Sequence, residues 1–125
     1  MTGQIRILVT ISRDWRRWGS VRATMKALWS EFPGAVLVHG DNPLCDRKVA
    51  TLWKALGGTE EAWPADWATE GRAAGPRRNR RMVESNPDVV VAFVRNGSAG
   101  ASGTVAMAVA AGLRVHVLAD DEGES

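Results

Sequence analysis

The Gly-rich stretch "RNGSAGASGT" follows the apolar run "VVVAFV" and is a place where this chain could do chemistry. Gly97, Gly100 and Gly103 permit tight turns and let a ligand approach the backbone closely. Ser102, Gly103 and Thr104 are expected to open the next helix, where free N–H groups and the helix dipole favour an anion such as phosphate. The stretch therefore predicts an anion site, and the alternative is a flexible connection.

Two stricter phosphate-binding motifs are absent. No lysine follows these glycines, as a P-loop requires. The dinucleotide-binding fingerprint belongs after the first strand of its fold, whereas this loop comes late in the chain. The expected anion site is therefore of another kind.

Arginines gather in the segments "SRDWRRW" and "GRAAGPRRNRR", although the formal net charge is only +2. Arginine suits forked contacts to phosphate or carboxylate groups, so the second cluster is a candidate phosphate-binding segment. A solvated basic face is the alternative for any single arginine.

The six tryptophans make nucleic-acid binding a further possibility. Trp15, Trp18 and Trp29 share one predicted helical face and indicate core, whereas Trp63 and Trp67 flank "PAD" and could stack on bases.

The carboxylates of "HGDNPLCD" allow two interpretations. Asp41 and Asp46 stand where a helix begins, so capping and first-turn stabilisation explain them as well as catalysis does. His39 and His116 fall inside predicted strands. With Cys45 as the single cysteine, the sequence offers no metal-ligand spacing and no internal disulfide, which suits a reducing cytoplasm.

The elements that must position these residues alternate between strand and helix. Strands are predicted over 4–11, 35–39, 87–94 and 113–118, with a weak one near "TEEAW", and helices over 14–32, 43–56, 76–85 and 101–112. A long polar connection is expected over 64–75. This alternation predicts an α/β fold, a three-layer Rossmann-like domain with a mostly parallel central sheet of about five strands.

At 125 residues the chain predicts a single domain, residues 1–119, followed by an acidic tail, residues 120–125, that we expect to be disordered. The N-terminal "MTGQIRILVTI" has Arg6 inside its apolar stretch, so it indicates a strand rather than a signal peptide. No apolar run approaches the length of a membrane span. A cytoplasmic protein without a membrane partner is expected.

Four segments together, "TISRDW", "VLVHGDNPLCDRKVA", "PADWATEGRAAGPRRNRRMVE" and "DVVVAFVRNGSAGASGT", resemble the YspA/cpYpsA-related SLOG family. These are small Rossmann-like domains related to the Lonely Guy phosphoribohydrolases and to DprA. The resemblance covers about Ile5 to Leu118. It implies a ligand-sensing or sequestering domain that holds a nucleotide or nucleotide-derived molecule through phosphate at the strands' carboxyl ends, with no cofactor required.

The resemblance also implies where the ligand lies. Arg77, Asn79 and Arg80 would bind the phosphate, and Asp46 would orient a ribose or an arginine. The expected binding residues are Ser12, Arg13, Asp14, Gly40, Asp41, Asp46, Arg77, Asn79, Arg80, Gly97, Ser98, Gly100, Ser102, Gly103 and Thr104.

The chain departs from the Lonely Guy pattern at one decisive position. "GSAGASGT" stands in place of "PGGxGT", and the catalytic glutamate expected three residues after the threonine is Met107 here. Cleavage of the base is therefore not expected by that mechanism. Two alternatives remain: a hydrolase using Asp41, Asp46 or Glu84 as a relocated carboxylate, and a DprA-like binder of single-stranded nucleic acid. The family resemblance also permits a homodimer or higher oligomer.

Overall fold

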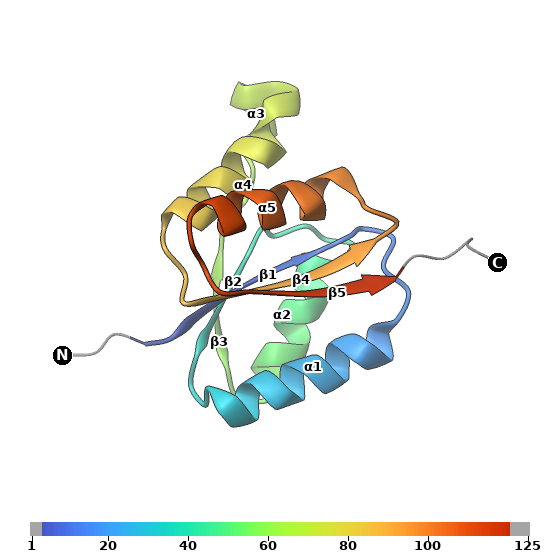
Figure 1. Cartoon of the computed structure of the whole chain (residues 1–125), viewed down its shortest axis with the longest axis vertical. Helices are drawn as coiled ribbons and strands as arrows, with labels where there is room; N and C mark the ends of the chain where they lie inside the picture. Colours follow the sequence, from blue (N-terminus) through green and yellow to red (C-terminus); the bar gives the residue numbers. More distant parts are fainter. Residues whose placement is uncertain (1–3, 121–125) are drawn as a thin grey trace.

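A parallel sheet lies between two layers of helices in the computed structural model, which describes residues 4–120 (Figure 1). The strands are β1 (Arg6–Ile11), β2 (Val36–His39), β3 (Thr59–Ala62), β4 (Val89–Arg95) and β5 (Val115–Asp120), in the spatial order β3-β2-β1-β4-β5. Every neighbouring pair runs parallel. The predicted three-layer α/β fold is confirmed, and the weak strand near "TEEAW" is β3.

The helices divide between the two faces of the sheet. Figure 1 shows α1 (Trp18–Glu31) and α2 (Asp46–Ala55) on one face and α4 (Ala74–Glu84) and α5 (Ala99–Ala110) on the other. The short α3 (Trp67–Glu70) and the 3₁₀ turn η1 (Gly71–Ala73) precede α4. This division follows from the strand order, which reverses between β1 and β4.

Alternate side chains of the strands fill two cores. Ile7, Val9 and Ile11 of β1 pack with the side chains of α1 and α2, whereas Leu8 packs with those of α4 and α5. All seven residues of β4 are buried, as expected for a strand covered on both faces. The predicted core role of the first tryptophans is confirmed: Trp15 is 4% exposed, and Trp18 and Trp29 pack against the same cluster.

Several predicted boundaries were wrong. α1 starts at Trp18, because Trp15 first closes a turn by donating its N–H to the Ser12 carbonyl at 3.1 Å. The expected connection over 64–75 contains α3, η1 and the start of α4. α5 begins two residues early, at Ala99. β5 extends to a buried Asp120, which was assigned to the tail; the rest of the predicted tail lies outside the described residues.

The reversal of strand order decides where a ligand can lie. At such a switch point the loops that follow the strands diverge and leave a crevice at the carboxyl edge of the sheet. Here the loops after β1, β2 and β4 end at that edge, on either side of the reversal.

Candidate functional site

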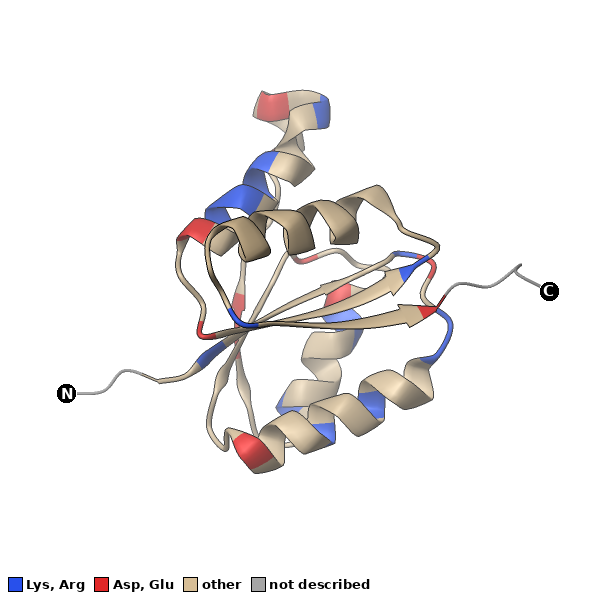
Figure 2. Ribbon diagram, in the orientation of Figure 1, with Lys and Arg blue, Asp and Glu red and all other residues tan. Residues whose placement is uncertain are grey.

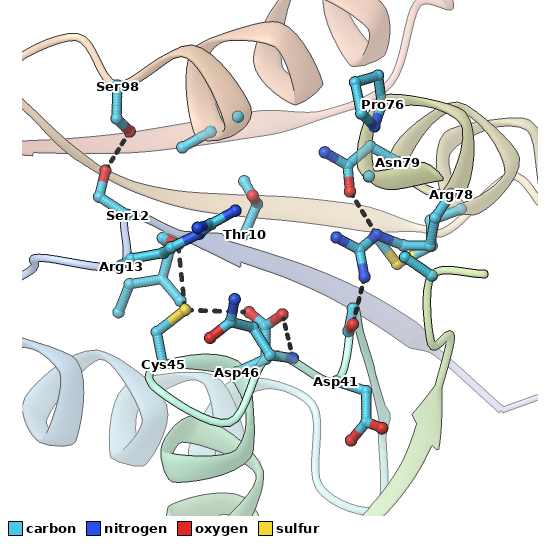
Figure 3. A pocket seen from close by; sticks show the side chains of 18 of the residues that line it. Thr10, Ser12, Arg13, Asp41, Cys45, Asp46, Pro76, Arg78, Asn79 and Ser98 are labelled. Atoms are coloured by element: carbon cyan, nitrogen blue, oxygen red, sulfur yellow. Dashed lines mark hydrogen bonds between the residues drawn. The ribbon is translucent and has the colours of Figure 1, made fainter. Parts of the chain in front are cut away.

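A cavity of about 810 Å³ lies at the carboxyl ends of β1, β2 and β4 (Figure 3). Its size falls within the range of about 300–1,000 Å³ that is usual for small-molecule sites. One face of α4 and the first turn of α5 complete the wall. Of the residues predicted from the sequence it contains Ser12, Arg13, Asp14, Gly40, Asp41, Asp46, Asn79, Ser98 and Gly100.

The first turn of α5 is left open toward this cavity. Ser98 occupies the N-cap position, where its hydroxyl would ordinarily accept a backbone N–H. Instead that hydroxyl forms a short hydrogen bond with the hydroxyl of Ser12, which in turn accepts the N–H of Arg95 at 2.9 Å. Among the described residues, nothing accepts a hydrogen bond from the N–H groups of residues 99–101, which line the cavity.

The predicted anion site at Ser102, Gly103 and Thr104 is therefore displaced by one helical turn. The N–H of Ser102 already donates to the Ser98 carbonyl at 2.9 Å, and the hydroxyl of Thr104 donates to the Gly100 carbonyl at 3.0 Å. None of the three lines the cavity. Gly97 lies outside it as well; its φ of 61° forms the turn before the helix. These four residues lie outside the cavity because α5 begins earlier than its sequence indicated.

Four arginines line the cavity: Arg13, Arg47, Arg72 and Arg78. Arg13, from the loop after β1, extends across it in Figure 3 and has no hydrogen bond or ion pair with the described residues. Arg78 donates from Nε to the Asn79 side chain at 2.7 Å and from Nη1 to the carbonyls of Gly40 and, at 3.2 Å, Trp63. Burial lowers the pKa of Arg78. Its guanidinium thus ties α4 to the end of β2.

Gly40 is required by that contact. A Cβ atom added to it would lie 2.6 Å from the guanidinium of Arg78, a separation that real Cβ atoms do not show. Gly40, the residue directly after β2, is therefore a point where backbone and side chain approach closely. Any larger residue at this position would push Arg78 out of place.

Helical spacing decides which arginines of α4 reach the cavity. Gly75, Arg78, Asn79 and Met82 follow an i, i+3, i+4, i+7 pattern and all line it. Arg77 does not line it, and Arg80 lies in a separate groove with Glu84 and Met107, among others. The predicted residues Arg77 and Arg80 thus lie outside the cavity, whereas Arg78, which was not among the predicted residues, lines it.

Arg77 instead pairs with an acidic residue outside the cavity. Its Nη1 lies 3.4 Å from Glu70 Oε2, and Arg81 Nη2 lies 2.8 Å from the same oxygen. The hydrogen bond from Arg81 is the main cause that lowers the pKa of Glu70. The basic segment thus divides: Arg72 and Arg78 line the cavity, whereas Arg77 and Arg81 hold α3 against α4.

Of the three candidate catalytic carboxylates, Asp46 is the one that the cavity wall buries. It is 8% exposed, its Oδ2 accepts the N–H of Asn42 at 3.0 Å, and burial raises its pKa. It occupies the first turn of α2, as expected. Glu84 is remote, in the groove beside Arg80.

Asp41 lines the cavity, but its side chain is already paired. Its carboxylate forms an ion pair with Arg47 at 2.9 Å, and this hydrogen bond lowers its pKa. Figure 3 shows the carboxylate turned away from Arg13 and Arg78. It does not cap α2, whose N-cap residue is Cys45. Asp14 is also paired, with Arg95 at 2.9 Å.

The histidine and cysteine near the cavity are structural. The Nδ1 of His39 accepts the N–H of Asp41 at 3.0 Å, so its Nε2 carries the proton and donates to Glu60 at 2.7 Å. Burial raises the pKa of Cys45 to about 12, which leaves a thiol rather than a nucleophilic thiolate. Over residues 4–120 no group of His, Cys, Asp and Glu side chains could hold a metal ion.

Comparison with known proteins gives one family. The chain is 32% identical over 117 residues to the Gene 61 protein of Mycobacterium phage D29, and the match covers 88% of this chain and 93% of that protein. The chain belongs to the family of this phage protein. No family model matches it, and no solved structure does. Because the name of the phage protein states no activity, function must be argued from the cavity.

The helices of residues 4–120 were also tested for length and hydropathy. None of them is long and apolar enough to cross a membrane.

Proposed function

We propose that this protein binds a nucleotide or nucleotide-derived molecule through phosphate in the cavity at the carboxyl edge of the sheet. The observation that carries the proposal is the open first turn of α5, whose N-cap Ser98 is engaged by Ser12, together with the unpaired guanidinium of Arg13 in the same cavity. Backbone N–H groups at a helix start and an arginine are complementary to a phosphate group.

The remaining wall suits the rest of such a ligand. Arg78 and Asn79 stand across the cavity from Ser98 in Figure 3, and Asp46 also lines the cavity. A carboxylate there would accept hydrogen bonds from sugar hydroxyls. Ligand sensing or sequestering requires only these binding groups, which agrees with the resemblance to SLOG domains.

A second candidate function is hydrolysis of the bond between base and sugar. Buried Asp46 favours it, since a carboxyl group with a raised pKa can exchange protons with a bound ligand. Met107, which occupies the place of the Lonely Guy glutamate in the sequence comparison, lines the groove with Arg80 and not this cavity. Incubation with AMP tests this candidate: release of free adenine that is lost in Asp46→Asn would establish it.

The binding proposal is tested by calorimetry with AMP, GMP and ribose 5-phosphate. Arg13→Ala should weaken phosphate-bearing ligands by about 10- to 160-fold, the equivalent of a charge-assisted hydrogen bond of about 1.5–3 kcal/mol. Arg80→Ala is the matched control, because Arg80 is exposed and lies outside the cavity. It should leave the affinity unchanged.

Two results would contradict the proposal. One is the failure of every phosphate ligand to bind the wild-type protein. The other is an equal loss in the two arginine variants, since that would reflect overall charge and not a defined phosphate position.

A further inference from the structure

Trp67 is an exposed tryptophan at the wall of the cavity. Its exposed fraction is 53%, whereas Trp53 is fully buried and Trp15 is 4% exposed. Trp63, the other tryptophan expected to be available to bases, packs instead against the core on the α4 side of the sheet. Its Nε1 donates to Glu61 at 2.6 Å. Of the two tryptophans that flank "PAD", Trp67 is thus the one placed to meet a ligand.

The short helix that carries Trp67 is fixed at both ends. Asp66 caps its start by accepting the N–H of Thr69 at 3.2 Å. Near its end Glu70 receives Arg81 through both carboxylate oxygens, at 2.8 and 3.1 Å. Figure 1 shows α3 projecting beyond the body of the molecule, so these contacts and those with α4 hold it there.

The indole itself is positioned by a glycine. A Cβ atom at buried Gly75 of α4 would lie 3.2 Å from Cη2 of Trp67, closer than an ordinary contact. The absence of that atom lets the ring lie directly on the helix backbone. One edge of the ring thus packs against α4 in the free protein, and a side chain that is already packed loses less conformational entropy when a ligand binds.

The cavity thus combines two kinds of contact surface. The open turn of α5 and Arg13 present hydrogen-bond donors and positive charge, whereas Trp67 presents a fixed aromatic surface. A sugar phosphate would use the first surface and leave the second in water. A ligand with both a phosphate and a planar heteroaromatic ring would use both.

We infer that Trp67 stacks on the base of the bound nucleotide, and that the ligand is consequently a nucleotide with its base attached and not a free sugar phosphate. This inference rests on the proposed function of the cavity. Every base can stack because each has a π face, so Trp67 contributes more to the affinity for nucleotides than to selectivity among bases. Purines, with the larger ring system, should bind more tightly than pyrimidines.

The experiment compares AMP, CMP and ribose 5-phosphate by calorimetry on the wild type, Trp67→Leu and Trp67→Phe. The wild type should prefer AMP to ribose 5-phosphate by about 5- to 160-fold, the equivalent of about 1–3 kcal/mol for a stacked base. Trp67→Leu should remove this preference while leaving ribose 5-phosphate binding unchanged, and Trp67→Phe should retain most of it. Val109→Ala is the control for an exposed apolar residue, since Val109 is 61% exposed and outside the cavity.

The outcomes separate the two proposals. Equal binding of AMP and ribose 5-phosphate by the wild type, or an equal loss of both in Trp67→Leu, would overturn the stacking inference and leave phosphate binding intact. If none of the three ligands bound the wild type, the proposed function would fall, and the inference with it.

Discussion

Asp46 is a buried carboxylate beside the cavity, and burial of its charged form costs free energy. Burial is the main cause that raises its pKa from 3.8, so the folded protein binds a proton there more readily than the unfolded chain. The contribution of Asp46 to stability is therefore most favourable below pH 3.8 and is lost as the pH rises through its folded pKa. A residue that destabilises the free protein near neutral pH is well explained by a role with a ligand.

Asp46→Asn should accordingly increase the free energy of unfolding of the free protein at neutral pH. The asparagine oxygen can still accept the N–H of Asn42, so the loop before α2 keeps its hydrogen bond. The gain should disappear in acid, where the native carboxyl group is protonated. Urea denaturation across this pH range measures both effects.

Glu60 provides a control, because its pKa is shifted in the direction opposite to that of Asp46. Its pKa is lowered from 4.5, chiefly by the hydrogen bond from His39, so its stabilising contribution is present above that value and is lost as the pH falls through the folded pKa. Glu60→Gln should therefore destabilise the protein at neutral pH and have little effect in acid. If both variants destabilised the protein at neutral pH, the assignment for Asp46 would be wrong.

At the scale of elements, the position at which α5 begins decides which backbone N–H groups face the cavity. Gly100 lies in the first turn and lines the cavity, whereas Gly103 lies one turn later, exposed to solvent. Gly100→Val should lower nucleotide affinity by about 10-fold or more, because the branched side chain would occupy space beside the free N–H groups and weaken charge-assisted hydrogen bonds. Calorimetry on the folded variant measures this.

Gly103→Val is the matched substitution on the same helix. An added Cβ at Gly103 meets nothing within 4 Å, and its φ is not in the left-handed region. Affinity should remain at the wild-type level, and the free energy of unfolding should rise by about 0.3 kcal/mol, since valine has the better helix propensity. A loss of affinity in Gly103→Val equal to that in Gly100→Val would mean that the anion does not lie at the first turn.

The order of the elements was predictable from the sequence, but the residues that reach the cavity from each element were not. Continuous apolar runs such as "VVVAFV" can form only buried strands in an alternating chain, and the loops after them had to meet at one edge. The start of α5 was missed because "GSAGASGT" offers two residues of N-cap type, Ser98 and Ser102, and the earlier one is the N-cap. The hydroxyl of Ser98 contacts Ser12, which lies 86 positions away in the sequence. No local pattern reports such a contact.

Arg78 could have been found from the sequence. Met82 is the apolar residue that marks the inward face of α4, and stepping back by four and three residues leads to Arg78 and Asn79. The role of Glu70, in contrast, depends on how α3 folds back on α4, which the polar sequence "PADWATEGRAAG" does not indicate.

For the whole molecule, the distribution of charge bears on the nucleic-acid alternative. Acidic residues offset the sixteen basic ones to a net charge of +2, and Figure 2 shows α5 without charged residues beside the basic α4. Arg77 and Arg81 on α4 are paired with Glu70. We therefore expect single-stranded oligonucleotides to bind no more tightly than a Kd of about 10⁻⁶ M, the usual non-specific level.

Fluorescence anisotropy over a salt series measures this. Tight binding with a steep fall in affinity as salt increases would support the DprA-like alternative instead, since it would show that several phosphates are contacted. The same preparation, examined by sedimentation, would report whether the predicted homodimer forms.

Because the tryptophans differ in burial, the intrinsic fluorescence of the protein should report on ligand binding. Trp15 and Trp53 are shielded from solvent, so a collisional quencher such as acrylamide should reach Trp67 far more readily than either. A base resting on that indole would protect it from the quencher and change its emission. Occupancy of the cavity could then be followed by intrinsic fluorescence without a label, with Trp67→Phe as the spectroscopic blank.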